Sequence, residues 1–187
     1  MTLAAKSPPI FDGHNDILSV LYQSSAYPDI TAFGKSMSGH LDRNKALSGG
    51  FAGGFFAIWV PSPVNAVDKQ TQMSQPSYDL PLPSEIDLKS AVGVALAQAA
   101  LLCRLESAGW LSICTSVNAL NTAITDGKMA AIMHMEGAEA IDRDFLNLDM
   151  FRRLGLRSLG PVWSRPNQFG YGVPFRFPFS HVDTRRV

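Results

Sequence analysis

The chain has 187 residues, of which 46% are hydrophobic and 17% are charged, a composition that suits one soluble globular domain or a large part of one. Sixteen lysines and arginines balance sixteen aspartates and glutamates. This balance gives no electrostatic sign of a nucleic-acid partner or of an acidic substrate.

The amino-terminal residues, MTLAAKSPPIF, lack the basic and apolar regions of a secretory signal. The expected location is therefore cytoplasmic. The most apolar helix-like run, residues 91–102, is interrupted by Gln98 and flanked by Lys89 and Arg104. Because this run is shorter than the roughly 20 residues that a membrane span needs, we expect no membrane-spanning helix.

The first predicted strand lies within residues 8–18, PPIFDGHNDIL, and carries ionisable side chains at alternate positions. Alternate residues of a strand point to the same face, so Asp12, His14 and Asp16 would share one face. In a buried strand, unpaired groups of this kind would be costly. The pattern therefore indicates that these side chains have partners or ligands.

Residues 19–48 are polar and rich in turn-forming residues, and they are predicted to form a long loop with a little helix. In residues 49–61, GGFAGGFFAIWVP, four glycines accompany a continuous apolar run, which predicts a strand buried on both faces of a parallel sheet. A phosphate-binding turn would need a helix after the glycines, and here a strand follows. Close backbone packing or a sharp turn explains the glycines better.

Residues 61–83 contain five prolines and are predicted to form a long surface loop, a kind of segment that often acts as a functional lid. Further along the chain, helices are predicted over residues 85–108, 115–128 and 147–154, and strands over residues 129–141 and 154–163. Residues 164–187 are rich in aromatic residues, proline and glycine and are expected to be irregular.

The elements alternate in a way that predicts an α/β fold with a parallel sheet. No internal repeat or shift in composition divides the chain, so residues 1–187 are expected to form part of one domain. No helix is predicted after the last strand to cover it. The final residues, SHVDTRRV, could mark a frameshifted or truncated, and therefore aberrant, terminus.

His14 and Asp16 lie two residues apart near the end of the first strand, so both could reach one metal ion. Glu136 ends a different strand, and its carboxylate could bridge two ions. Imidazole nitrogen and carboxylate oxygen are suitable zinc ligands, and ligands gather at the carboxyl ends of strands in parallel sheets and barrels. Asp12 lies deeper on the same face and is expected to orient His14. The alternative is a core histidine that is merely hydrogen-bonded to a carboxylate.

His134 lies two residues before Glu136 and is expected to be a satisfied interior histidine. The nearby Met129, Met133 and Met135 are expected to fill the core. The sequence contains no GxSxG nucleophile elbow, and neither cysteine has a recognisable histidine partner. Metal-assisted hydrolysis is therefore the reaction class that the residues favour.

Four segments resemble the membrane dipeptidase (renal dipeptidase) family of zinc peptidases: FDGHNDIL, GGFAGGFFAIWVP, MHMEGAEAI and FRRLGLRSLGPVWSRPN. They follow the family's order and span nearly the whole chain. The resemblance implies a (β/α)₈ barrel of the amidohydrolase, or metal-dependent hydrolase, type with two zinc ions at the carboxyl ends of its strands. It implies that His14 and Asp16 bind the first zinc, that Glu136 bridges the pair, and that the substrate is a dipeptide, including some with a D-residue at the carboxyl end.

The chain departs from the family pattern in two ways. Many relatives have a substrate-contacting histidine after the fourth strand, where this chain has GPVWSRPN, so Trp163 falls at or beside this substrate-binding position. Relatives also supply two further zinc histidines, a substrate-binding arginine and a catalytic aspartate from the second half of the barrel. A typical barrel needs about 250 residues. We therefore expect roughly half a barrel, without an assigned catalytic residue, and little or no dipeptidase activity from this chain alone.

Two other interpretations stay open at this point. The chain could be a non-catalytic half-barrel that forms a homodimer to close its sheet, which would be an assembly or binding role. It could instead be a doubly wound α/β binding module without metal, in which His14 and Asp16 are only paired with each other.

Overall fold

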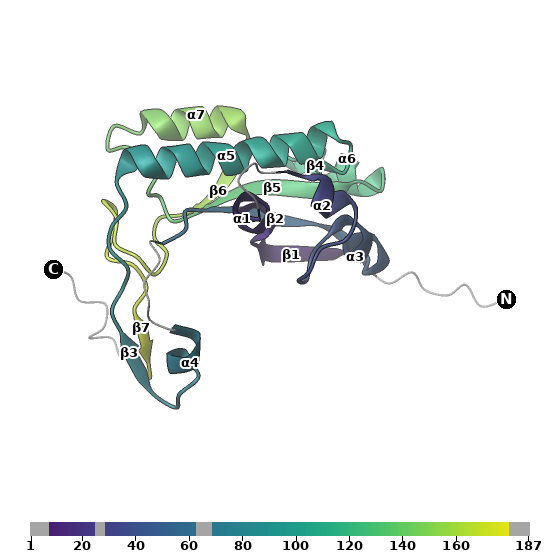
Figure 1. Cartoon of the computed structure of the whole chain (residues 1–187). Helices are drawn as coiled ribbons and strands as arrows, with labels where there is room; N and C mark the ends of the chain where they lie inside the picture. Colours follow the sequence, from purple (N-terminus) through teal and green to yellow (C-terminus); the bar gives the residue numbers. More distant parts are fainter. Residues whose placement is uncertain (1–7, 25–28, 63–68, 180–187) are drawn as a thin grey trace.

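The computed structural model describes residues 8–24, 29–62 and 69–179, and its centre is a parallel five-stranded sheet (Figure 1). The strands are β1 (Ile10–Asn15), β2 (Phe51–Trp59), β4 (Leu111–Ile113), β5 (Met129–Glu136) and β6 (Leu156–Gly160). β2 lies between β1 and β5, β4 pairs with the start of β5, and β6 pairs with its end. The predicted α/β fold with a parallel sheet is confirmed.

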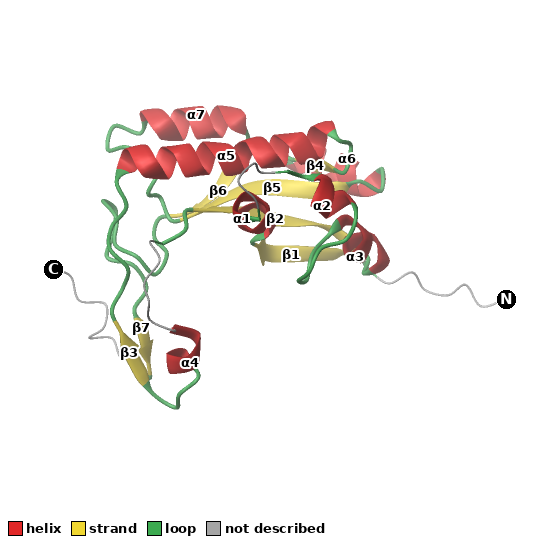
Figure 2. Ribbon diagram, viewed as in Figure 1, coloured by secondary structure: helices red, strands yellow, loops and turns green. Residues whose placement is uncertain are grey.

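Helices α5 and α7 lie along one side of this sheet (Figure 2). The helices around the sheet are α1 (Ile17–Gln23), α2 (Thr31–Gly34), α3 (Arg43–Ser48), α5 (Leu88–Ser107), α6 (Val117–Thr125) and α7 (Leu146–Leu154). Along β5, Met133 and Met135 are buried in the core, as expected, whereas Ile132, His134 and Glu136 are only partly buried. One face of the sheet therefore packs against helices, and the other face is more open.

The glycines of β2 allow three strands to pack closely. A Cβ atom at Gly53 would overlap the carbonyl oxygen of Ala130, and one at Gly54 would lie 2.8 Å from the Cβ of Asp12. After these glycines, Phe56 and Ile58 are buried in the core. Close backbone packing is confirmed as the reason for Gly53 and Gly54, whereas Gly50, with a φ angle of +70°, lies in a turn before β2.

The beginning of the chain differs from the predicted elements. β1 is the edge strand of the sheet and is mostly exposed, not a buried strand. Residues 19–48 contain more helix than expected, because α1 begins directly after β1 and buries Leu18 and Leu21, and α3 is capped by Asp42. The Asp42 carboxylate accepts the backbone N–H of Lys45, and this hydrogen bond is the main cause that lowers its pKa to about 2.

The strand β4 was not predicted, because its three residues are too few to show a period. The long helix also begins later than the predicted residue 85. It begins after Asp87, whose side chain accepts the backbone N–H of Ser90 at 2.9 Å. Asp87 is therefore the residue that caps α5.

Two segments that were predicted to be irregular meet in a small antiparallel sheet away from the main one (Figure 1). Residues 61–83 contain α4 (Lys69–Met73) and β3 (Tyr78–Leu80), and β3 pairs with β7 (Phe175–Phe177) from the region 164–187. Asp79 and Arg176 form an ion pair across these strands. The proposed aberrant end, SHVDTRRV, lies outside the described residues.

The helix α5 is longer than the apolar run 91–102 suggested. It has 20 residues, and an 18-residue window within it has a mean hydropathy of 1.4, enough to cross a membrane by length and composition alone. Of that window, 39% is buried inside the protein. The buried Gln98 accepts the backbone N–H of Trp59 at 3.0 Å and donates to its carbonyl oxygen at 2.6 Å. The length argument against a span was therefore wrong, but α5 packs here as a helix that covers a sheet.

Two glycine substitutions test this packing in opposite directions. Gly53→Ala is expected to lower the free energy of unfolding by about 1–3 kcal/mol, because a methyl group would overlap the β5 backbone. Gly93→Ala is the control: Gly93 is exposed inside α5 with open space around its Cβ position, so alanine should raise stability by about 1 kcal/mol. Urea unfolding measures both, and an undiminished stability of Gly53→Ala would contradict the close packing.

Candidate metal centre

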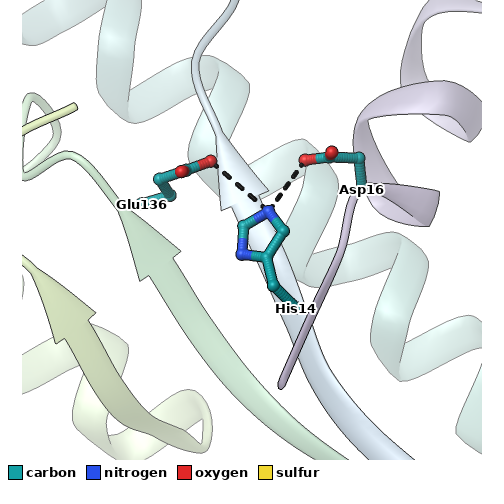
Figure 3. A group of neighbouring side chains, drawn as sticks. All are labelled: His14, Asp16 and Glu136. Carbon is teal, nitrogen blue, oxygen red and sulfur yellow. Dashed lines mark hydrogen bonds and ion pairs between the residues drawn. The ribbon is translucent and has the colours of Figure 1, made fainter. Parts of the chain in front are cut away.

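Three side chains converge at the carboxyl ends of two parallel strands. His14 lies near the end of β1, Asp16 follows as the residue before α1, and Glu136 is the last residue of β5. The His14 Nε2 atom lies 3.3 Å from Asp16 Oδ1 and 3.6 Å from Glu136 Oε2 (Figure 3). All three potential ligand atoms lie within 4.8 Å of one another. The structure thus brings together the three residues that were predicted as metal ligands.

The three side chains differ in how far solvent reaches them. The side chains of His14 and Asp16 are 38% and 58% exposed, and that of Glu136 is 26% exposed. Partial burial raises the pKa of Glu136 above its usual range, the positive form of His14 opposes this rise, and the carboxylates of Asp16 and Glu139 add to it. Negative charge is therefore crowded at this end of the sheet, which is where a cation would be stabilised.

Asp12 supports the main chain of His14 and not its ring. Its carboxylate accepts the backbone N–H of His14 at 3.3 Å and the side-chain amide of Asn15 at 3.1 Å. The same amide donates to the carbonyl oxygen of Phe55 at 3.1 Å, so this pair ties the end of β1 to β2. Among the described residues, Asp12 is therefore hydrogen-bonded to the main chain of His14. The pairing register shifts between Asp12 and Asn15, which breaks the strict alternation of side chains along β1.

His134 lies beneath the three converging side chains. Its Nδ1 atom is 2.8 Å from the hydroxyl oxygen of Ser158, and its ring meets those of His14 and Phe55 edge to face. Burial lowers the pKa of His134, the neighbouring His14 lowers it further, and the hydrogen bond to Ser158 opposes both effects. His134 is thus a hydrogen-bonded, partly buried histidine, and it is not a member of the converging group.

Trp163 belongs to an aromatic cluster on the loop after β6. Its ring packs edge to face against Trp59 and Phe175, with centroids 5.1 and 5.8 Å away. The backbone of Trp59 is the register partner of Glu136, which places this cluster at the same end of the sheet. Trp163 is not among the three side chains that converge at His14.

The sequence analysis missed a buried ion pair near these residues. The guanidinium group of Arg165 lies 3.0 Å from the carboxylate of Glu139, and both side chains are fully buried. Each of these residues stands alone in a loop, where no hydrophobic period marks its burial. The local sequence around Arg165 is the SRPN segment beside Trp163. This segment does not reveal that Arg165 pairs with a residue 26 positions away.

Comparison with known proteins decides the family. The model of the family described as membrane dipeptidase (Peptidase family M19) matches residues 2–179. The chain belongs to this family. It is 38% identical over 174 residues to an uncharacterised protein of Acinetobacter calcoaceticus, encoded in the PQQ-III 3' region, covering 92% of this chain and 54% of that protein. A Klebsiella pneumoniae protein from the pqqA 5' region, also uncharacterised, is 39% identical over 75 residues, which is 40% of this chain and 28% of that protein.

Solved structures share the fold of this membrane dipeptidase family member. A metallo peptidase from Rhodobacter sphaeroides, liganded with a phosphinate mimic of L-Ala-D-Ala, superimposes with a TM-score of 0.88 and 48% identity, covering 94% of this chain and 51% of that one. The metallo peptidase called dipeptidase AC gives a TM-score of 0.84 and 49% identity, with 92% and 49% covered.

A more distant structure agrees in fold alone. The probable dipeptidase PvdM from Pseudomonas aeruginosa gives a TM-score of 0.64 at 20% identity, with 89% of this chain and 38% of that one covered. The chain spans about half the length of the solved structures with the higher identities. The predicted fold, a partial (β/α)₈ barrel, is confirmed by these comparisons.

Proposed function

We propose that this chain supplies the amino-terminal zinc ligands of a metal-dependent dipeptidase, with His14 and Asp16 binding one zinc ion and Glu136 bridging to a second. The observation that carries this proposal is the convergence of three ligand atoms within 4.8 Å at the carboxyl ends of β1 and β5. In barrels of this type the carboxyl ends of the strands carry the active site.

The donor set fits zinc. Imidazole nitrogen and carboxylate oxygen bind zinc at about 2.0–2.2 Å, so two such atoms on one tetrahedral ion stand about 3.4 Å apart. The separations of 3.3 and 3.6 Å from His14 Nε2 agree with this spacing. Zinc, when bound, lowers the pKa of water and polarises a carbonyl group. The side chains of His14, Asp16 and Glu136 would hold their nitrogen and oxygen atoms close together at a solvent-accessible end of the sheet.

A small residue lets the ligands meet across β2. Ala57 is the register partner of His134 and is fully buried, but unlike Phe56 and Ile58 it does not belong to the core under the helices. It therefore lies on the same face as His134 and Glu136, where the His14 ring crosses toward Glu136. Its single methyl group leaves room for that crossing.

The proposed substrate is a dipeptide. The Rhodobacter sphaeroides metallo peptidase is liganded with a phosphinate mimic of L-Ala-D-Ala, and it is 48% identical over 94% of this chain. We infer that Trp163 lines the substrate-binding region, since it packs against Trp59 and the backbone of Trp59 pairs with Glu136. The indole rings would supply an apolar wall for the substrate.

The 187 residues supply only part of the proposed active site. Among the described residues, His14, Asp16 and Glu136 form the one cluster of potential metal ligands. Because the chain spans about half the length of its solved relatives, the second zinc site is proposed to be incomplete within it. We therefore propose that these residues alone have little or no dipeptidase activity.

A non-catalytic assembly role is the second candidate, and the exposed sheet edge favours it. The apolar side chains of Ile10 and Phe11 on β1 are exposed, and no strand pairs with the outer edge of β1 within the described ranges. An exposed edge of this kind invites pairing with another strand. A homodimer that covers this edge is the form that the second candidate takes.

Removal of the ligands tests the metal site. His14→Ala combined with Glu136→Ala is expected to abolish most zinc binding by the purified chain, because two of the three donors are lost. Equilibrium dialysis followed by metal analysis measures the zinc content, and circular dichroism checks the fold. Asp149→Asn, on the exposed side of α7, is the control for a lost carboxylate and should bind zinc as the wild type does. Equal zinc content in the double variant and the wild type would rule the site out.

Ala57→Val tests how the ligands meet. The added methyl groups would occupy the space over β2, so the zinc affinity is expected to fall about tenfold, as when outer contacts of a metal site are lost. Ala52→Val, at the partly exposed amino end of the same strand, should leave the affinity unchanged. Competition with a chromophoric chelator measures both, and an unaltered affinity of Ala57→Val would contradict the proposed crossing of β2.

The activity of the chain alone tests whether its proposed metal site is incomplete. With excess zinc and L-Ala-D-Ala, we expect no release of amino acid above the background. Hydrolysis at an enzyme-like rate would refute the incomplete site. Size-exclusion chromatography of the same sample tests the second candidate, since a stable species of twice the mass would support the homodimer and a monomer would count against it.

A further inference from the structure

Arg165 is a fully buried arginine that joins the ends of three strands. Its Nη2 group donates to the carbonyl oxygen of Val60 and its Nη1 group to the hydroxyl oxygen of Ser62, both at 2.8 Å, just after β2. Its Nε group donates to Glu139 Oε1 at 3.1 Å, in the turn after β5. Arg165 itself follows β6, so one side chain connects the loops at the carboxyl ends of β2, β5 and β6.

The turn that holds Glu139 begins directly after the proposed ligand Glu136. Gly137 has a φ angle of +86°, and a Cβ atom there would overlap the Glu139 carboxylate. The backbone N–H groups of Gly137 and Ala138 donate to the carbonyl oxygens of Gly160 and Pro161 at 3.0 and 3.1 Å. The Glu139 carboxylate therefore folds back over the residue that follows Glu136, in a turn already attached to the end of β6.

The ion pair is costly as a purely structural device. Glu139 Oε2 is buried, and no group among the described residues donates a hydrogen bond to it. A buried carboxylate is stabilising only when its oxygens are well paired. Replacing such a pair with apolar side chains of similar size often preserves stability. Stability alone therefore does not account for a guanidinium and a carboxylate at this place.

We propose that Arg165 is a positioning residue for the metal centre: by holding Glu139 against Gly137, it sets the direction in which Glu136 presents its carboxylate. This inference rests on the proposed metal site. Arg165 acts through the turn: among the described residues, its guanidinium group binds Glu139, Ser62 and Val60 and not the proposed ligands. Outer contacts of this kind commonly orient the ligands of metal sites.

The affinity of the 187-residue chain for zinc, measured by competition with a chromophoric chelator, tests the proposal. Arg165→Met is expected to weaken zinc binding about 10–100-fold. The double variant Arg165→Met/Glu139→Leu removes both charges and should recover much of the lost stability but not the zinc affinity. Arg165→Lys retains a charge for Glu139 and loses the fork of hydrogen bonds, so an intermediate affinity is expected.

Arg157→Met is the matched control. The guanidinium group of Arg157 donates to the carbonyl oxygens of Thr115, Arg152 and Leu156, near the start of β6. Its loss should lower the urea midpoint and leave the zinc affinity unchanged. The absorption spectrum of bound Co²⁺ gives a second reading, because it reports ligand geometry: it should change in the Arg165 variants and not in Arg157→Met.

The outcomes distinguish this inference from the metal site itself. A folded double variant that binds zinc and Co²⁺ as the wild type does would overturn the positioning role and leave the metal site standing. A wild-type chain whose zinc content does not depend on His14 and Glu136 would overturn both. Weakened binding in the Arg165 variants, with normal binding in Arg157→Met, supports the positioning role even where stability also falls.

Discussion

The pairing of β2 with β5 is the constraint on which the rest of the structure depends. The two strands run parallel, with Gly53 opposite Ala130 at the start and Trp59 opposite Glu136 at the end. Gly53 makes this approach possible, since any larger residue would meet the backbone of β5. Because side chains alternate along a strand, a slip of one residue in this register would exchange the two faces of the sheet.

The strand register places the residues that pack in the core on one face of the sheet and the proposed ligand Glu136 on the other face. Phe56 and Ile58 of β2 and Met133 and Met135 of β5 are buried in the core. The opposite face carries Phe55, Ala57 and Trp59 of β2 opposite Ile132, His134 and Glu136 of β5, and Glu136 stands at its carboxyl end. The core under the helices is thus built from one set of alternate residues, and the proposed ligand Glu136 belongs to the other set. The arrangement places the proposed metal site at a strand end without interrupting the core.

The sequence predicted the features that depend on local pattern. The long apolar runs of β2 and β5 were recognised because buried parallel strands have that composition, and His14, Asp16 and Glu136 followed from alternation and from their places at strand ends. The three-residue strand β4 was too short to produce a pattern. The pairing of β3 with β7 joins segments that are far apart in the chain. Arg165 was missed for the same reason, because its partners are 26 to 105 residues away.

The carboxylates of the proposed metal site and the Glu139 carboxylate of the neighbouring turn differ in how their negative charge is balanced. At this end of the sheet, the carboxylates of Asp16 and Glu139 both raise the pKa of the Glu136 carboxyl group, in addition to the effect of burial. Glu139 is matched by a guanidinium group held in place by hydrogen bonds to β2 and its following loop. Among the described residues, His14 is the ion-pair partner of both Asp16 and Glu136. Burial is the main cause that raises the pKa of Glu136, and the carboxylates of Asp16 and Glu139 raise it further. The protein thus neutralises the carboxylate that supports the turn and leaves the two converging carboxylates for a cation to neutralise, which is the electrostatic condition that a metal centre requires.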